Sequence, residues 1–335
     1  MMGLSSSVVV THGDCDGVIS AYLYIKHFMK DMWPSRITVV FTQPWRANLD
    51  LMRGLHEGVG ELILLDLALN NELVNEIVKA SSSLRRVTVV DHHVSSLEFV
   101  KRVSELASSN VKVVCERTQS CPKLIMNSLR ISPNPYERML VDVADVCEGG
   151  EASSLDVARL ADIIKLSIAR DPGDYDFMNY LLNLFMRNKD VESDDVVGRR
   201  YRTAKFLLGR LLKLMSENAL SYRNVVKIST LTLPESRIFA GLLGIGTTEL
   251  ARMYKSDIVL VRREEDKVVV TVRTLNEKAL KLCEGIARLG KGRFGGHAEA
   301  ASTTLPGLNL QEVTDLIVGA VGNVREDTQQ GKRNS

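Results

Sequence analysis

The sequence predicts an α/β protein in which a parallel, doubly wound sheet domain is joined by a helical linker to a smaller α/β domain. Three observations support this fold class. Short apolar runs alternate with helical patterns from the N-terminus to Asn134, as in a parallel sheet with right-handed crossovers. A mainly helical stretch follows Pro135, and a second set of strand patterns begins near Asn224. A chain of 335 residues is long enough for two such domains.

The first domain is expected to contain five parallel strands, because each run is short and rich in Val, Ile and Leu, as in strands buried on both faces. The runs are Val8–Thr11, Ile37–Phe41, Ile63–Asp66, Val87–Asp91 and Val111–Cys115. Helical patterns lie at Val18–Lys30, at Asn71–Ser81 after an Asn70 N-cap, and at Lys123–Leu129. In the first of these helices, Ile19, Leu23 and Phe28 are expected to face the sheet.

A loop at Gln43–Arg46 follows the second strand, because Pro44 lacks an N–H and disfavours a helical Gln43. We expect Trp45 in this loop to pack against the protein. The alternative is that Trp45 and Arg46 stack on and pair with a nucleotide.

The region after Asn134 is expected to form helices at Ser154–Ala169, Tyr175–Arg187 and Ser193–Tyr222. The last of these carries a basic row, for which a solvated helix face is favoured over a nucleic-acid groove. Its members are Arg199, Arg200, Arg202, Lys205 and Arg210. The expected parts of the chain are a first domain at 1–192, a linker at 193–223, a second domain at 224–325 and a disordered tail at 326–335.

The second domain is expected to begin with a strand at Val225–Thr230, a helix at Glu235–Tyr254 that is broken at glycines, and a hairpin of Ile258–Arg262 with Lys267–Thr274. A glycine-rich segment from Gly290 to His297 follows, and a helix is expected directly after it. Glycine pairs let backbone N–H groups approach an anion, and Arg293 and His297 add charge and donors. Arg273 is either a second phosphate contact or a solvent-facing strand residue.

The composition is that of a soluble globular protein, with 45% hydrophobic and 25% charged residues. A net charge of +2 neither favours nor excludes nucleic acid. No apolar stretch approaches the ~20 residues of a membrane span, and no signal peptide is visible, so a cytoplasmic protein is expected. Its five cysteines are therefore expected to be reduced thiols, with Cys15 a small buried filler.

Three strand patterns end in acidic or histidine side chains, and the ends of neighbouring parallel strands meet at one edge of the sheet. These side chains are His12, Asp14, Asp16, Asp66, Asp91, His92 and His93. One Asp at a strand end is usually a cap or turn former, but several grouped carboxylates repel unless a cation joins them. Mixed carboxylate and imidazole ligands suit manganese, magnesium, zinc or iron. Two ions about 3.5–4 Å apart would favour metal-assisted hydrolysis of a phosphate ester or anhydride.

Four motifs together resemble the DHH phosphoesterases, which include RecJ-type nucleases and oligoribonucleases. They are His12-Gly-Asp14-Cys-Asp16-Gly17, Asp66, Asp91-His92-His93 and Gly295-Gly296-His297. Several members of that family space the first pair as His-x-x-x-Asp, whereas this chain has His12-x-Asp14, which is similar to archaeal RecJ-like members.

The resemblance implies roles for these residues. Asp66 would bridge two manganese ions, with magnesium or another divalent ion as alternatives. His12 and Asp14 would hold one ion. Asp16, His92 and a later Asp would hold the other, and Asp145 is favoured over Asp142 for that place. His93 would lie near the phosphate, beside Asp91. Arg293, Gly295, Gly296 and His297 would hold substrate phosphate across a cleft from the metals.

The expected function is a manganese-dependent phosphodiesterase that hydrolyses the ends of single-stranded DNA or RNA, as a RecJ-like exonuclease does. The alternative within the same chemistry is an oligoribonuclease or a phosphatase of 3′-phosphoadenosine phosphate or dinucleotides. The alternative of another class is a RecJ-like scaffold that binds a replication or repair helicase. An active nuclease that also binds such a partner is compatible with the ligand set.

Overall fold

The computed structural model describes residues 5–222, 226–296 and 298–331, and the chain divides into two compact units between Tyr201 and Arg202. The division falls inside helix α9 (Asp195–Glu217), whereas the sequence places the end of the first domain at residue 192. Among the described residues, no helix combines the length and the apolar character needed to cross a lipid bilayer.

The first unit is built on a five-stranded parallel sheet with the order β2-β1-β3-β4-β5. The strands are β1 (Ser6–His12), β2 (Ile37–Thr42), β3 (Val59–Leu65), β4 (Arg86–Asp91) and β5 (Val111–Cys115). Every neighbouring pair is parallel, which confirms the expected sheet. The order places β1, β3 and β4 side by side, so their carboxyl ends meet at one edge.

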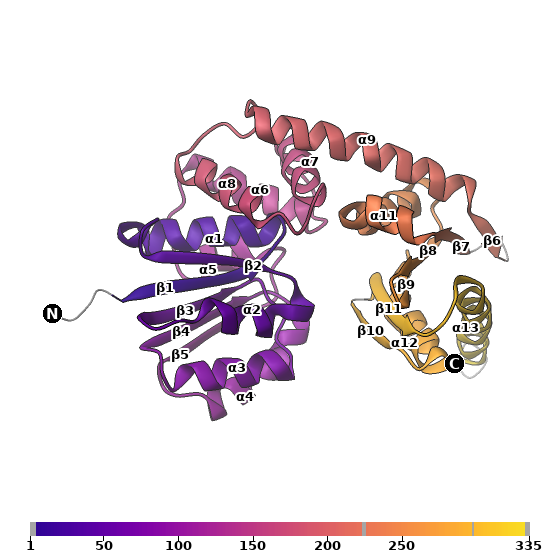
Figure 1. Ribbon diagram of the computed structural model, residues 1–335, viewed down its shortest axis with the longest axis horizontal. Coiled ribbons are helices and arrows are strands. Elements are labelled where there is room, and N and C mark those ends of the chain that lie inside the picture. Colours follow the sequence, from indigo (N-terminus) through magenta and orange to yellow (C-terminus); the bar gives the residue numbers. More distant parts are fainter. Residues whose placement is uncertain (1–4, 223–225, 297, 332–335) are drawn as a thin grey trace. The chain divides into compact units, whose positions relative to one another are not determined.

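Helices cover both faces of this sheet, as in a doubly wound fold (Figure 1). One face carries α1 (Cys15–Phe28) and α5 (Cys121–Ser128), backed by α6 (Pro135–Cys147), α7 (Leu155–Ala169) and α8 (Tyr175–Met186). The other face carries α2 (Ala47–Gly54), α3 (Asn71–Ser81) and α4 (Leu97–Leu106). Short 3-10 turns are η1 (Lys30–Met32), η2 (Pro44–Arg46) and η3 (Val94–Ser96).

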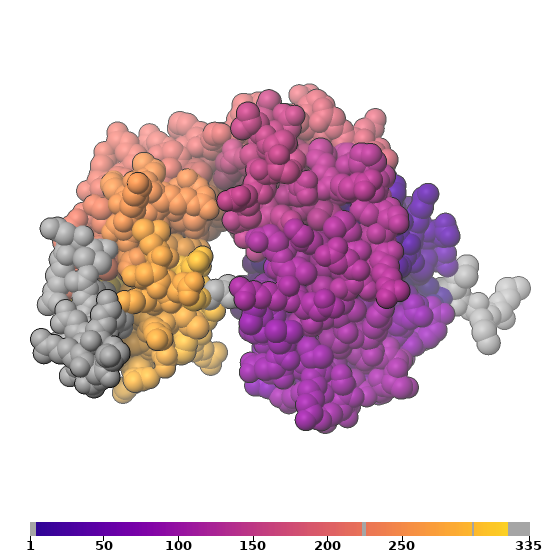
Figure 2. All heavy atoms as spheres, turned by 180° about the vertical axis from the view of Figure 1, so that it is seen from behind, coloured from indigo at the N-terminus to yellow at the C-terminus, as the bar shows by residue number. Residues whose placement is uncertain are grey.

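The central strand of the first unit is fully enclosed, with Val8, Val9 and Val10 at 0% exposure. On the face drawn in Figure 2, this unit shows mainly purple and magenta residues, and indigo N-terminal residues are visible only at one margin. The side chains that follow β1 are therefore fixed by a rigid, buried strand.

Two expectations about single residues in the first unit are wrong. Phe28 is 47% exposed as the last residue of α1, whereas Ile19 and Leu23 are fully buried, as expected. Cys15 and Cys147 form a disulfide that joins the first turn of α1 to the last turn of α6, so these two are not reduced thiols. Cys115, Cys121 and Cys283 are free, as expected.

The second unit is built on a mixed sheet with the order β10-β11-β9-β8-β7-β6. The strands are β6 (Leu220–Tyr222), β7 (Val226–Leu231), β8 (Asp257–Glu264), β9 (Lys267–Arg273), β10 (Arg293–Gly296) and β11 (Ala300–Pro306). The helices beyond α9 are α10 (Leu233–Ile238), η4 (Ala240–Leu242), α11 (Leu243–Tyr254), α12 (Ala279–Gly290) and α13 (Leu310–Gly331). The expected β8–β9 hairpin is confirmed.

The helix expected over Glu235–Tyr254 is interrupted between Ile238 and Leu243, around Gly241, as a helix with glycine breaks should be. The sequence interpretation fails in three places in the second unit. Helix α12 lies between β9 and the glycine-rich segment. Residues after His297 form β11 instead of a helix, because antiparallel pairing with β9 outweighs the helix preference of the alanines. Helix α13 continues to Gly331, so residues 326–331 of the expected tail are helical.

Candidate metal centre

The first motif occupies the turn from β1 into α1. The Asp14 side chain caps α1 by accepting a hydrogen bond of 2.9 Å from the N–H of Gly17. A Cβ atom at Gly17 would lie 2.0 Å from the carbonyl oxygen of His12, so only glycine allows the helix to approach the strand end this closely. Asp16 is fully buried and accepts hydrogen bonds of 3.2 and 3.0 Å from the N–H of Cys121.

The second motif is Asp66, directly after β3. It is 2% exposed and has a φ of 56°, which is unusual for a residue other than glycine. Its N–H donates to the carbonyl of Val90 at 3.0 Å, which holds the turn against β4. Strained backbone of this kind is found where a fold must aim one side chain at a functional site.

The third motif follows β4, where the three residues have different partners. Nδ1 of His92 lies 3.2 Å from the carbonyl of Thr118, which leaves Nε2 to face the cluster. Asp91 is fully buried, and one of its oxygens lies 2.7 Å from Nδ1 of His93. The hydroxyl of Ser96 donates to the other oxygen. Asp91 therefore orients His93.

The three motifs converge beyond the ends of β1, β3 and β4. Nε2 of His92 lies 3.3 Å from Oδ1 of Asp66 and 3.6 Å from Oδ2 of Asp16. Nδ1 of His12 lies 3.0 Å from Oδ2 of Asp14 and 3.8 Å from Oδ2 of Asp66. Among the described residues, four trios each place one ligand atom per side chain within 4.8 Å, and Asp66 belongs to three of them. The trios are Asp66, His92 and His93; His12, Asp14 and Asp66; Asp16, His92 and Glu148; and Asp16, Asp66 and Cys121.

The carboxyl groups of the cluster differ in their pKa. Burial and the neighbouring carboxylates raise the pKa of Asp16 and of Asp66 well above the usual value. Burial also acts to raise the pKa of Asp14, but the charge and hydrogen bond of His12 and the N–H of Gly17 lower it to about 2. Asp16 and Asp66 thus resist ionisation unless a positive charge is added.

The histidines of the cluster also differ in their pKa. Burial, followed by the charge of His93, lowers the pKa of His92, so this ring is a neutral imidazole as metal binding requires. Burial also acts to lower the pKa of His93, but the hydrogen bond and charge of Asp91 raise it overall. Asp14 has the corresponding effect on His12, whose pKa is raised against the effect of burial.

Two buried atoms of the cluster, Oδ2 of Asp66 and Nε2 of His92, have no hydrogen-bond partner within the described parts of the chain. Nearly all buried polar atoms in native proteins are satisfied, so such a pair needs an explanation. A divalent cation would satisfy both atoms and allow Asp16 and Asp66 to ionise. The residues present therefore fit a carboxylate–imidazole metal site.

Asp145 lies in α6 and is 8% exposed, but the structure pairs it elsewhere. Its oxygens lie 2.6 Å from Nζ of Lys123 and 2.7 Å from the hydroxyl of Ser120. Asp142, the alternative, accepts a hydrogen bond of 3.0 Å from Ser153. Neither belongs to the four trios.

The sequence reasoning missed Glu148, which caps α6 and joins Asp16 and His92 in one trio. Burial and the charge of Asp14 raise the pKa of Glu148 to about 7. The available signal was its spacing of three residues from Asp145, which places both carboxylates on one face of a helix.

The glycine-rich segment of the second unit forms an exposed edge strand, β10, instead of a loop. Gly296 has a φ of 132°, and a Cβ atom there would lie 2.4 Å from the carbonyl oxygen of Ala300. Gly295 faces open space, and Arg293 is exposed on the same strand. His297 lies outside the described residues.

The structure also gives the contacts or exposure of the other residues considered for substrate binding. Nε of Arg273 donates to Thr248 of α11 at 3.0 Å, so this guanidinium is not turned into solvent. Trp45 is 77% exposed, so the expectation that it packs is wrong; Arg46 beside it is held by Asp50 at 2.8 Å. Arg200, from the basic row, is bonded to Asp174 at 2.6 Å and lies over Phe177, so it is not a solvated member of a row.

Comparison with known proteins identifies the second unit. A family model described as the DHHA1 domain matches residues 226–323. No curated protein matches in a sequence search.

Solved structures match almost the whole chain. RecJ from Thermus thermophilus, solved in complex with Mn2+, is 16% identical with a TM-score of 0.64 over 95% of this chain and 52% of that chain. PggH from Vibrio cholerae, a pGpG-specific phosphodiesterase, is 14% identical with a TM-score of 0.61 over 95% and 99%. CDC45 from Entamoeba histolytica is 9% identical with a TM-score of 0.63 over 94% and 95%. This chain therefore has the same two-domain α/β fold, although it spans about half the length of the Thermus protein.

Proposed function

We propose that the chain is a DHH-family protein, because a DHHA1 domain model matches residues 226–323, and that it is a metal-dependent phosphoesterase acting on nucleic-acid ends. The observation that carries the proposal is the buried, unsatisfied pair of Asp66 Oδ2 and His92 Nε2 within a cluster of carboxylates and imidazoles. Bound divalent cations would supply a hydroxide nucleophile and stabilise charge that develops on phosphoryl oxygens.

Asp66 is proposed to contact both of two ions, because it takes part in three of the four trios. His12 and Asp14 would complete one site. Manganese is the proposed ion, with magnesium as the alternative, because both suit a mixed carboxylate and imidazole set. RecJ from Thermus thermophilus has been solved with either ion, which supports this choice.

Asp16, His92 and Asp145 are proposed to complete the second site. Asp145 would exchange its ion pair with Lys123 for the metal, since one cation replaces another. Glu148 is the competing carboxylate, because it already lies near Asp16 and His92.

His93 is proposed to face the reacting phosphate. Asp91 holds Nδ1 and so orients the ring, and His93 would donate a proton or hydrogen bond to a phosphoryl or leaving oxygen through Nε2. The raised pKa of His93 keeps this ring positively charged to a higher pH than an isolated histidine. Asp91 acts through His93 and is a positioning residue.

The proposed substrate is single-stranded DNA or RNA, cut from an end. Arg293, Gly295, Gly296 and His297 are proposed to hold its phosphate, with Arg273 as a further contact. Gly295 and Gly296 are exposed residues of an edge strand next to an exposed arginine, and an outward-facing N–H of such a strand suits a phosphate. The likeness in fold to RecJ supports this substrate class.

A second candidate is a phosphodiesterase of dinucleotides or very short oligonucleotides. It is favoured by the likeness to PggH, of which this chain covers 99%, compared with 52% of the Thermus RecJ chain. A scaffold that only binds a replication or repair helicase is less well supported, because the complete ligand cluster has no role there. An active enzyme with such a partner remains within the proposal.

The test is hydrolysis of end-labelled dinucleotides, pentanucleotides and long strands, in DNA and RNA versions, with manganese or with a chelator. Asp66→Asn is the informative variant, because asparagine tolerates positive φ and keeps the shape of the side chain. Asp31→Asn, at an exposed position, is the matched control. Manganese-dependent hydrolysis that Asp66→Asn abolishes and Asp31→Asn preserves is expected. Full activity in chelator, or in Asp66→Asn, would contradict the proposal.

A further inference from the structure

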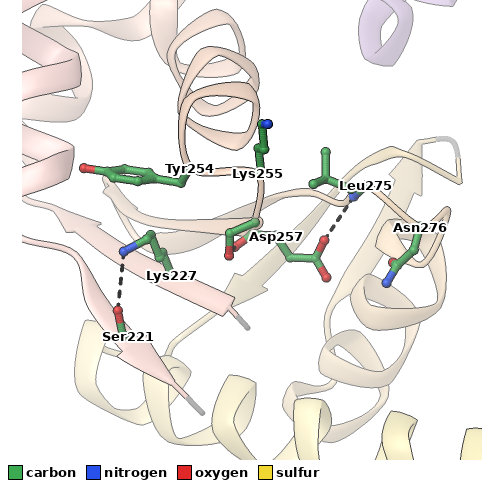
Figure 3. Close-up of a pocket in the computed structure, with 8 residues that line it drawn as sticks. Ser221, Lys227, Tyr254, Lys255, Asp257, Leu275 and Asn276 are labelled. Atoms are coloured by element: carbon green, nitrogen blue, oxygen red, sulfur yellow. Dashed lines mark hydrogen bonds between the residues drawn. The ribbon is translucent and has the colours of Figure 1, made fainter. Parts of the chain in front are cut away.

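The second unit contains a pocket of about 390 Å³, within the range of small-molecule sites. Figure 3 shows Lys227 and Tyr254 on one side, Leu275 and Asn276 on the other, and Asp257 between them. The lining residues are Ser221, Lys227, Tyr254, Lys255, Ser256, Asp257, Leu275 and Asn276. None of them belongs to the residues proposed above for substrate phosphate.

The pocket lies at the same end of the sheet as the glycine-rich strand. The strand register pairs Gly296 with Ala301 at that end of β10 and β11, and Ala300 with Arg273. Farther across the sheet, Asp257 pairs with Val226, the neighbour of Lys227. Lys227 on β7 lies three strands from β11, which is about 14 Å at the usual strand spacing.

One segment connects the two places directly. The N–H of Thr274 donates to the carbonyl of Glu299 at 3.0 Å, which ties the segment to the start of β11. One residue later, the N–H of Leu275 donates to Asp257 at 3.0 Å, and Leu275 and Asn276 then line the pocket. The segment Thr274 to Asn276 therefore links the start of β11 to the pocket along this end of the sheet.

The pocket combines two lysines, an aromatic ring and an amide with the Asp257 carboxylate, which the N–H of Leu275 holds. The ammonium group of Lys227 lies 4.3 Å from the ring centroid of Tyr254 and 3.5 Å from the hydroxyl of Ser221, so it is held at the pocket wall. Lys255 adds a second positive charge, and the amide of Asn276 offers both a donor and an acceptor. Lysines beside an aromatic ring are the usual means of binding the phosphates and bases of single strands without sequence preference.

We propose that this pocket is an accessory subsite for single-stranded nucleic acid, occupied by a nucleotide several units away from the one at Gly295 and Gly296. The inference rests on the proposed function for the class of substrate and extends it to substrate length. A dinucleotide is too short to reach both places, whereas a longer strand covers both. The subsite therefore adds affinity for long strands alone.

The test measures binding in chelator, so that no strand is cut, using a fluorescent dinucleotide and a fluorescent single strand of about twelve nucleotides, within the span of single-strand sites. The variants are Lys227→Gln and Tyr254→Leu, which remove the charge and the aromatic face but keep most of the volume. Lys267→Gln is the control, because it removes the same charge at the opposite end of β9.

We expect Tyr254→Leu to weaken binding of the long strand about tenfold and Lys227→Gln to reduce its salt dependence by about one phosphate contact. Dinucleotide binding should be unchanged, and Lys267→Gln should behave as wild type. Equal losses of affinity for the dinucleotide and the long strand would overturn the subsite. No loss of affinity for the long strand would also overturn it, as would a wild-type protein that binds both lengths equally well. Hydrolysis is measured separately, so a strand that binds through the pocket but is never cut contradicts only the proposed activity.

Discussion

The carboxyl edge of the first sheet and the glycine-rich end of the second sheet present functional groups in opposite ways. In the first, carboxylates and imidazoles are buried and rigid, and Asp16, Asp66 and Asp91 have at most 2% exposure. In the second, Arg293, Gly295 and Gly296 lie exposed on an edge strand. Burial raises the energy of charges that have no cation, whereas exposure leaves backbone donors open to an anion. The difference supports the proposal of a metal site in the first sheet and a phosphate site in the second.

Glycine substitutions give the largest expected contrast between the two places. Gly17→Ala should destabilise the protein by at least about 3 kcal/mol and abolish metal binding, because its Cβ would meet backbone at 2.0 Å. Gly295→Ala should change stability by less than about 0.5 kcal/mol, because nothing lies within 4 Å. Urea unfolding and manganese titration check both. Similar unfolding midpoints for the two variants would contradict the expected difference in packing between Gly17 and Gly295.

The disulfide of the first unit gives the next effect. Cys15 and Cys147 are 132 residues apart, so Cys147→Ser should reduce the free energy of unfolding by about 2–4 kcal/mol. Cys115→Ser, at a free and half-buried cysteine, is the control. Wild type with reductant should unfold like Cys147→Ser without it. A wild-type unfolding curve that reductant does not shift would mean that the bond is not formed in solution.

Manganese should stabilise the protein, and more at pH 8 than at pH 5. The pKa values of Asp16 and Asp66 are raised in the folded state, so the metal-free fold loses stability as pH rises above their unfolded pKa towards their folded pKa. Bound metal favours the ionised carboxylates and reverses that loss. Melting temperatures with manganese or chelator at both pH values provide the measurement. An equal metal-induced shift at both would contradict the assigned ligands.

The smallest expected effect is the difference in manganese affinity between variants of two carboxylates of α6, Asp145 and Glu148. Asp145→Asn is expected to weaken manganese binding about tenfold, and Glu148→Gln less. Calorimetric titration of both variants compares them directly, with Asp142→Asn as the control on the same helix. A larger loss in Glu148→Gln would assign the last ligand to Glu148, which already lies beside Asp16 and His92.

The first sheet could be predicted from the sequence because its strands are short apolar runs, and three of them are followed by acidic or histidine side chains. All five strands are confirmed, and His12, Asp16 and His92 each lie within 4 Å of another member of the cluster around Asp66. The partner of Asp145 could not be predicted, because Lys123 reaches it from another helix. The Cys15–Cys147 disulfide could not be predicted either, because only the packing of α1 against α6 brings the two sulfurs together.

The second unit was harder to predict because its local signals conflict with its pairing. Residues after His297 are rich in alanine, yet Ala300 and Ala301 pair with β9. Helix α12 was not predicted, because only the glycines that follow this stretch gave a recognisable sequence signal. The pocket beside Lys227 depends on β7, β8 and the segment after β9 meeting at one end of the sheet, and no contiguous motif encodes that meeting.

The left-handed backbone at Asp66 bears on how such a protein changes over generations. A single nucleotide change converts an Asp codon to Asn, and asparagine tolerates this backbone as well as aspartate does. Under the proposed metal site, one mutation would therefore remove the shared carboxylate while the sheet, the disulfide and the C-terminal domain persist. Under the proposed function, the descendant would keep its substrate contacts and lose hydrolysis. A lineage could thus pass in one step from a hydrolase to a protein that only binds the same ligand.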